Sequence, residues 1–146
     1  MYTLMSEASF DSAHFLADYQ GKCKNIHGHR WTIKIEIYGD TLQESGSFRG
    51  MLLDFGDIKN ELKKLADDLD HALIIEKGTM NKKLLDLLKE NDFRVIELDF
   101  RPTAENFAKY SFDYFTEKGF FVKQATVYET PTNFATYSQG CSNGTI

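Results

Sequence analysis

Hydrophobic and polar residues alternate along two segments near the N-terminus. Residues 31–37 read Trp-Thr-Ile-Lys-Ile-Glu-Ile, and a period of two is typical of a strand with one buried face. We therefore predict a strand over roughly residues 27–39. A first strand precedes it, in which one parity comprises Tyr2, Leu4, Ala8, Phe10 and, if no bulge intervenes, His14. Paired as an antiparallel hairpin, the two strands would bring His14 close to the start of the second strand.

Two later segments have the spacing of amphipathic helices. Asp54 is the predicted N-cap of the first, because its carboxylate can accept hydrogen bonds from the backbone N–H groups of the first turn. This helix ends near residues 69–71. The second begins with Thr103 as its cap and Glu105 in the positive first turn, and Gly119 closes it. The apolar faces comprise Ile58, Leu62, Leu65 and Leu69 in the first helix and Ala104, Phe107, Ala108, Phe112 and Phe115 in the second.

The remaining segments predict shorter elements. Residues 79–90 indicate a short helix with Thr79 as its cap, and residues 95–98 are extended. Residues 121–130 alternate again and predict a strand. A last strand begins at residue 134, after a turn that contains the second proline of the chain.

The order of the main elements is strand, strand, helix, helix, strand, strand (ββααββ). This order predicts an α+β fold in which a four-stranded antiparallel sheet carries two long helices on one face. Residues 1–146 are expected to form a single domain with a substantial core. Such a sheet has two exposed edges, and pairing with other subunits into a closed barrel would protect them. Residues 138–146 form a small, polar tail that we expect to be loose.

Composition and charge exclude several classes of protein. Apolar residues make up 42% of the chain and charged residues 27%, so neither a disordered nor a membrane-embedded protein is expected. The net charge of -5 makes nucleic acid an unexpected partner. The N-terminus lacks the pattern of a secretory signal. With only Cys23 and Cys141 there is no disulfide framework, and a reducing cytoplasm is the simpler expectation.

Histidines supply the strongest chemical pattern. His27 and His29 flank a single glycine at the start of a predicted strand, so both side chains point to the same face. With His14 from the first strand, three neutral imidazoles and an open fourth position would make a zinc site of the catalytic type. Two alternatives remain open at this point. Only two of the histidines bind a metal, or Cys23 closes the site as a fourth, structural ligand.

Three other positions carry candidate chemistry. His71 directly follows Asp70, and a carboxylate can orient an imidazole for proton transfer, or the two residues are simply a polar pair at the end of a helix. Cys23 lies between Lys22 and Lys24, whose charges would favour a thiolate. Glu129 shares strand parity with buried-type residues, where a carboxylate needs a partner. It could accept two hydrogen bonds from an amidine group of a ligand, or it could simply end a strand in solvent.

Six motifs follow one another along nearly the whole chain. They are, in order, Phe10-Asp11-Ser12-Ala13-His14, Cys23-x-x-x-His27-Gly28-His29, Asp54-Phe55, Leu69-Asp70-His71, Pro102-Thr103-Ala104-Glu105-Asn106 and Val127-Tyr128-Glu129-Thr130-Pro131. Together they resemble the 6-pyruvoyltetrahydropterin synthase family of the tunnelling fold. Three residues separate Cys23 from His-Gly-His, a spacing similar to that of the 6-carboxytetrahydropterin synthase branch, which serves queuosine and other deazapurine synthesis.

The resemblance implies a role for each matching residue. It implies that Cys23 is the general base, assisted by Asp70 and His71, and that Glu129 anchors the pterin ring. The zinc ligands that it implies are His14, His27 and His29, and the further residues of the pterin pocket are Thr103 and Glu105.

The resemblance also implies a reaction and an assembly. The implied enzyme is a zinc-dependent lyase that converts 7,8-dihydroneopterin triphosphate to 6-carboxy-5,6,7,8-tetrahydropterin, acetaldehyde and triphosphate. Related enzymes form homo-oligomers, commonly hexamers, with sites between subunits. Two alternatives remain: a 6-pyruvoyltetrahydropterin synthase, which keeps the carbon skeleton of the substrate, and a zinc-stabilised pterin-binding module without turnover.

Overall fold

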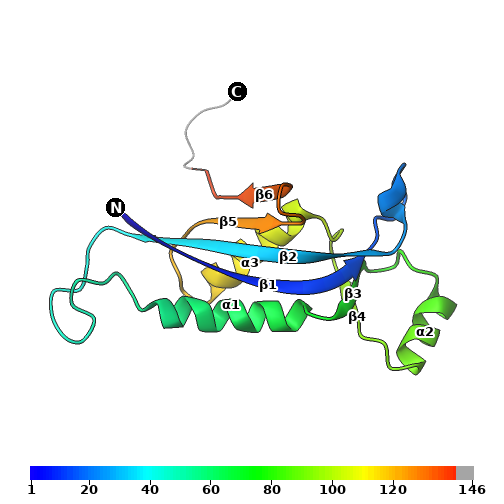
Figure 1. Ribbon diagram of the computed structural model, residues 1–146, viewed down its shortest axis with the longest axis horizontal. Helices are drawn as coiled ribbons and strands as arrows, with labels where there is room; N and C mark the ends of the chain where they lie inside the picture. The colour runs from blue at the N-terminus through cyan, green and yellow to red at the C-terminus, as the bar shows by residue number, and fades with distance from the viewer. Residues whose placement is uncertain (141–146) are drawn as a thin grey trace.

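The computed structural model of the protein describes residues 1–140, which form one curved, six-stranded sheet with helices against it (Figure 1). The strand order across the sheet is β4-β3-β1-β2-β5-β6. The strands are β1 (Tyr2–His14), β2 (His27–Gly39), β3 (Ala72–Glu76), β4 (Val95–Leu98), β5 (Val122–Tyr128) and β6 (Phe134–Tyr137). The helices are α1 (Phe55–Leu69), α2 (Lys82–Glu90), α3 (Ala104–Glu117) and a short 3-10 helix, η1 (Lys22–Lys24).

The long hairpin of β1 and β2 forms the centre of the sheet, as predicted. The two strands pair antiparallel over their whole length, from Tyr2 opposite Gly39 to His14 opposite His27. No bulge interrupts β1, so Phe10 and His14 share one face and both are buried. The alternation seen in the sequence is therefore the alternation between the core face and the opposite face of this sheet.

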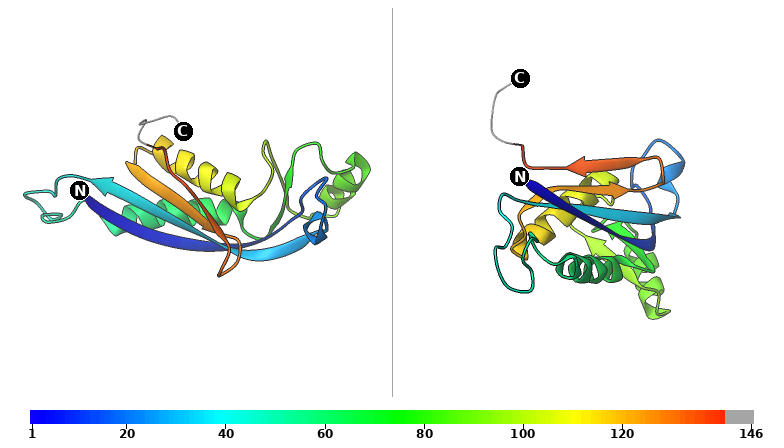
Figure 2. Two further views of the ribbon diagram at one scale, coloured as in Figure 1. Left: turned by 90° about the horizontal axis from the view of Figure 1, so that it is seen from above. Right: turned by 60° about the vertical axis from the view of Figure 1, so that its left-hand side comes forward.

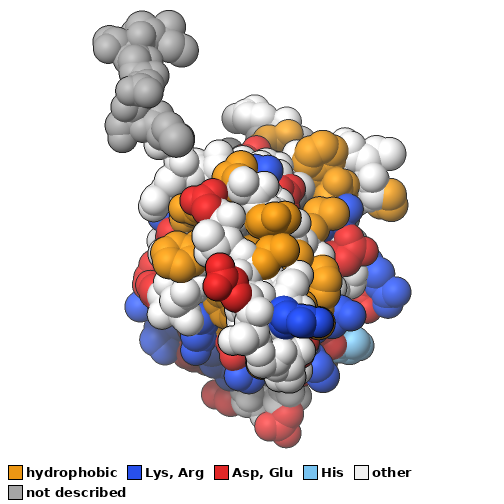
Figure 3. Space-filling view, turned by 90° about the vertical axis from the view of Figure 1, so that its left-hand side faces the viewer, with side chains coloured by type: hydrophobic (Ala, Val, Ile, Leu, Met, Phe, Trp, Pro, Cys, Tyr) orange, Lys and Arg blue, Asp and Glu red, His pale blue; other side chains and the backbone are white. Residues whose placement is uncertain are grey.

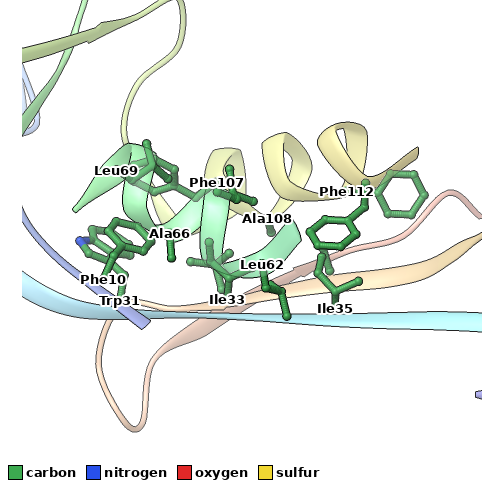
Figure 4. Packing of buried hydrophobic residues seen from close by; sticks show 14 of the residues in the cluster. Phe10, Trp31, Ile33, Ile35, Leu62, Ala66, Leu69, Phe107, Ala108 and Phe112 are labelled. Atoms are coloured by element: carbon green, nitrogen blue, oxygen red, sulfur yellow. The ribbon is translucent and has the colours of Figure 1, made fainter. Parts of the chain in front are cut away.

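Helices α1 and α3 cover one face of the sheet (Figure 2). Both predicted N-caps are confirmed: Asp54 accepts a hydrogen bond from the backbone of Gly56, and Thr103 accepts one from the backbone of Asn106. Large side chains from β1 and β2 meet those of the two helices in a continuous core (Figure 4). This core includes Phe10, Trp31, Ile33, Ile35, Leu62, Leu65, Phe107 and Phe112.

The sheet differs from the predicted four antiparallel strands. β3 pairs with the end of β1 and β4 pairs with β3, and both pairings are parallel, so the sheet is mixed and has six strands. β3 is a run of five residues directly after α1, and β4 has four residues. Runs this short show no clear period, and the parallel partner of β3 lies about 60 positions earlier in the chain. Local pattern therefore could not place them in the sheet.

The short helix also begins later than predicted. Asn81, not Thr79, is the N-cap of α2, and its side chain accepts from the backbone N–H groups of Lys83 and Leu84. The Thr79 hydroxyl instead donates to the carbonyl of Glu76, at 2.6 Å. Both residue types suit an N-cap. The Thr79 side chain is used in the turn after β3, and the cap therefore falls on Asn81. The predicted tail lies mostly outside the described residues, as does Cys141.

The face of the sheet opposite the helices is polar, and its side chains pair with one another. Lys34 lies 3.3 Å from Glu7, and Gln124 donates to Glu36 at 2.6 Å. On the side of β1 that faces away from β2, β3 covers only residues 12–14. β6 has β5 as its neighbour on one side. Among the described residues, one edge of β6 and most of one edge of β1 are therefore unpaired.

Hydrophobic side chains are exposed at the end of the molecule where β2 ends and α1 begins (Figure 3). They lie among charged side chains and include Met1, Tyr2, Met51, Phe55 and Phe121. Exposed apolar groups of this size, next to unpaired strand edges, are typical of a surface that contacts another subunit. None of the helices in residues 1–140 has the length and apolar character that crossing a bilayer requires.

The stability of the fold should depend on the aromatic core. Phe107 is 1% exposed and contacts Phe10, Trp31 and Phe100. We expect Phe107→Ala to lower the free energy of unfolding by about 3–5 kcal/mol, because it leaves a cavity. Phe93 is 63% exposed, so the matched change Phe93→Ala should have an effect of about 0.5 kcal/mol or less. Denaturant unfolding measures both, and equal losses would contradict this description of the core.

Candidate metal centre and active site

Three histidines meet at one end of the central hairpin. The register places His14, the last residue of β1, opposite His27, the first residue of β2, and His29 follows two residues later on the same face. The ring centroids lie 4.5 to 5.2 Å apart. One nitrogen of each ring lies within 4.8 Å of the other two. The structure thus brings together the three predicted ligands, and among the described residues Cys23 does not join this group.

Two backbone carbonyls fix how these rings are oriented. His14 Nδ1 donates to the carbonyl of Pro102, at 2.8 Å, and His27 Nδ1 donates to the carbonyl of Asn25, at 2.7 Å. A carbonyl can only accept, so each Nδ1 carries the hydrogen, and each neutral ring has its lone pair on Nε2. The two Nε2 atoms nevertheless face each other at 3.1 Å. Two lone pairs at this distance repel unless a cation lies between them.

Burial makes a proton an unfavourable choice for that cation. His14 is 1% exposed, and desolvation lowers its pKa below the usual value, with the neighbouring His27 acting in the same direction. The pKa of His29 is also lowered, mainly by burial. His29 Nε2 is buried and has no hydrogen-bond partner among the described residues. Three imidazoles with converging ring nitrogens fit a metal ion, and the all-nitrogen set suits zinc.

The ring of Trp31 lies next to this centre. It packs edge to face against His14 and His29, with centroids 5.1 and 5.5 Å away, and it is fully buried. Phe10 and Phe107 pack against its other sides. The hydrophobic core therefore continues up to the histidines and holds two of their rings from one side.

The predicted pterin-pocket residues also lie together. Thr103, Glu105 and Glu129 line one cavity of about 340 Å³, next to the start of α3 and the turn between β5 and β6. Glu129 also lines a second cavity, of about 520 Å³, which it shares with His29. Its carboxylate lies 3.6 Å from the Nε2 atoms of both His14 and His29. Glu129 therefore stands between the histidines and the cavity of Thr103 and Glu105.

Asp70 and His71 form the expected pair at the end of α1. His71 Nδ1 lies 2.6 Å from Asp70 Oδ2. The other oxygen of Asp70 accepts from the backbone N–H of Asp11, at 2.7 Å. These two contacts, the backbone N–H first, lower the pKa of Asp70. The carboxylate thus stays ionised and orients the ring of His71, which is exposed.

The backbone around this pair is held in place by residues that the sequence did not single out. His71 has a positive φ of 50°, a conformation that is uncommon for a residue with a side chain. The N–H of His71 donates to the carbonyl of Asp11, and Arg94 donates to the carbonyls of Asp68 and Asp70. Arg94 comes just before β4, and through these hydrogen bonds it caps the C-terminus of α1. These contacts join segments that are far apart in the sequence, so no local motif predicts them.

Cys23 lies in η1, within the loop that joins β1 to β2, and is partly exposed. Its carbonyl accepts from the backbone N–H of Leu16, whereas His71 is bonded to Asp11. Among the described residues, no side-chain hydrogen bond and no metal-ligand grouping joins Cys23 to His71.

Comparison with known proteins agrees with this geometry. The sequence profile described as 6-pyruvoyl tetrahydropterin synthase matches residues 3–140. The chain belongs to this family. A 6-carboxy-5,6,7,8-tetrahydropterin synthase of Haemophilus influenzae is 34% identical, over 95% of this chain and 100% of that protein. A protein of the same name from Aquifex aeolicus is 33% identical, over 81% of this chain and 76% of that protein.

Solved structures of low sequence identity share the fold of this family member. An uncharacterized protein from Wolinella succinogenes superposes with a TM-score of 0.76 at 17% identity, over 95% of this chain and 98% of the other. The 6-pyruvoyl tetrahydropterin synthase of Caenorhabditis elegans superposes with a TM-score of 0.66 at 24% identity, over 95% and 96% of the two chains. The predicted α+β fold class is thus confirmed, with the corrected strand count described above.

The metal centre makes a direct prediction. The double variant His27→Ala/His29→Ala should fail to retain zinc, because two of the three converging nitrogens are removed. His71→Ala is the matched control, since this histidine lies outside the cluster, and it should keep about one zinc per chain. Metal analysis by mass spectrometry after zinc loading and dialysis measures both. Full zinc occupancy in the double variant would contradict the assignment.

Proposed function

We propose that this protein is a zinc-dependent 6-carboxy-5,6,7,8-tetrahydropterin synthase. Its substrate would be 7,8-dihydroneopterin triphosphate, which reacts with water to give 6-carboxytetrahydropterin, acetaldehyde and triphosphate. The observation that carries the proposal is the convergence of three imidazoles on one point, beside cavities large enough for a small ligand. The names of the relatives in Haemophilus influenzae and Aquifex aeolicus support the choice of reaction.

The proposed chemistry divides between a metal and the residues of the chain. Zinc held by His14, His27 and His29 supplies a Lewis acid that acidifies substrate hydroxyl groups. The Cys23 thiolate accepts a proton from a carbon of the substrate side chain. Asp70 holds His71 through Nδ1, which leaves Nε2 free to exchange protons at the exposed side of the ring.

Recognition of the substrate is assigned to the cavity next to α3. Glu129 and Glu105 offer carboxylates to the amino-pyrimidinone edge of a pterin, where paired N–H donors match two carboxylate oxygens. Thr103 lines the same cavity, although its hydroxyl also caps α3. The single core beneath both cavities supports the assignment of residues 1–146 to one domain.

The absence of a contact between Cys23 and His71 among the described residues leads to a shared site. We propose that Cys23 of one subunit works with Asp70 and His71 of another, within a homo-oligomer for which a hexamer is favoured. The unpaired edges of β1 and β6, with the exposed apolar groups at the end of the molecule, support such an assembly. His71 is 80% exposed in the single chain, so its ring is available to a neighbour.

Product analysis tests the reaction. Incubation of the zinc-loaded protein with 7,8-dihydroneopterin triphosphate should give 6-carboxytetrahydropterin by mass spectrometry, with an equal amount of acetaldehyde in a separate assay. A 6-pyruvoyl product without acetaldehyde would identify the protein as the other synthase of the family. Tight zinc binding with no product at all would indicate the binding module.

The shared site predicts complementation between inactive variants. Cys23→Ala and His71→Ala should each lower turnover by roughly 10²–10⁴, the usual contribution of a general acid or base. Both should keep their zinc, because neither residue belongs to the histidine cluster. When the two variants are unfolded together and refolded as a mixture, activity should reappear, because some sites then combine an intact Cys23 with an intact His71.

Two results would contradict the shared site. A mixture as inactive as its components would mean that Cys23 and His71 act within one chain. A Cys23→Ala protein that loses zinc would instead make the thiol a metal ligand. Separately refolded samples that are mixed only afterwards serve as the control.

A further inference from the structure

Glu129 has a position that pterin binding does not account for. Its Oε1 atom lies 3.6 Å from His14 Nε2 and also 3.6 Å from His29 Nε2. Both distances are slightly too long for a hydrogen bond. Ligands of a tetrahedral zinc ion, each about 2.0–2.1 Å from it, lie roughly 3.3–3.4 Å apart. The carboxylate oxygen therefore has the spacing of a further zinc ligand from two of the three imidazoles, those of His14 and His29, and is not a hydrogen-bond partner of either.

The charges around Glu129 leave it without another ionic partner. Arg30 and Lys34 line the same cavity, but Arg30 pairs with Asp11 at 2.9 Å and Lys34 with Glu7 at 3.3 Å. Among residues 1–140, the only groups within ion-pair distance of Glu129 are the two histidines. A carboxylate that is about two-thirds buried needs a partner, and a metal ion held by the histidines would supply one.

The backbone that carries Glu129 is firmly fixed. The N–H groups of Glu129 and Thr130 both donate to the carbonyl of Asn133, and the Thr130 hydroxyl accepts from the N–H of Asn133. These bonds close the turn between β5 and β6. They set the direction in which the Glu129 side chain leaves the sheet, toward the histidines that β2 presents next to β5.

The geometry points to Glu129 as the fourth zinc ligand of the substrate-free protein. This inference rests on the metal centre of the proposed function and adds a closed resting state to it. The carboxylate oxygen occupies the position that substrate oxygens need, and on substrate binding it exchanges places with them. Freed from the metal, the carboxylate is then available to the pterin in the cavity that it shares with Thr103 and Glu105.

Zinc affinity tests this inference without any turnover. Competition with a chromophoric chelator at neutral pH should show zinc binding weakened at least about tenfold in Glu129→Gln, the scale on which partners of a metal site act. Glu129→Asp keeps the charge but withdraws the oxygen by one methylene group, and it should weaken binding to a similar extent. Glu105→Gln removes a carboxylate from the same cavity and should leave the affinity unchanged.

The pattern across the variants separates coordination from charge alone. Wild-type affinity in Glu129→Asp, with a loss only in Glu129→Gln, would mean that the carboxylate acts at a distance and would overturn the inference. Unchanged affinity in all three variants would overturn it as well. Circular dichroism of each variant excludes unfolding as the cause of weaker binding. The zinc affinity of His27→Ala serves as the reference for the loss of one ligand.

Cobalt substitution provides a second, direct measurement. If Glu129 fills the fourth position, the visible spectrum of the cobalt-loaded wild type should not respond to added azide. In Glu129→Gln the position is open to solvent, and azide should shift the spectrum. Equal responses in the two proteins would overturn the inference. Because neither measurement uses substrate, a negative result here is distinct from a failure of the proposed reaction in the product assay.

Discussion

The register of the β1–β2 hairpin is the constraint on which the rest of the structure depends. Its pairing puts His14 opposite His27 and, by the same alternation, puts Phe10 and Trp31 into the core. A slip of one residue would turn every side chain of one strand to the other face. The core and the metal centre would then be lost together. Because the bulky aromatic residues can be buried in only one register, the hydrophobic effect also positions the histidines.

Segments that are far from the hairpin in the sequence complete the surroundings of the three histidines. The carbonyl of Pro102 orients His14, and the following residue, Thr103, begins α3. Glu129 approaches from the turn after β5. Helix α3 and strand β5, which the turn follows, are both packed on the same core, so the orientations of the histidine rings and of Glu129 are consequences of the whole fold. An outer shell of this kind is what usually tunes a metal site.

The chemical groups of the single chain come from different segments. The three histidines lie at the end of β1 and the start of β2, and Glu129 follows β5. Asp70 and His71 lie at the end of α1, fixed by Asp11 and Arg94, and Cys23 lies in the loop of the hairpin. An enzyme that moves protons at several substrate atoms needs donors on more than one side of the ligand. Association through the unpaired strand edges is the proposed way in which this chain brings them together.

The sequence by itself determined the elements whose pattern is local. The alternation of Ile33 and Ile35, the caps Asp54 and Thr103 and the spacing of His27 and His29 are set by neighbours within a few residues. The hairpin, both long helices and the shared face of His27 and His29 could therefore be predicted. Only the tertiary structure decided the parallel strands β3 and β4, the carbonyl of Pro102 as partner of His14, the capping by Arg94 and the approach of Glu129 to two imidazoles. Each of these is a contact between segments far apart in the chain, and its formation depends on how the core packs, which no local period records.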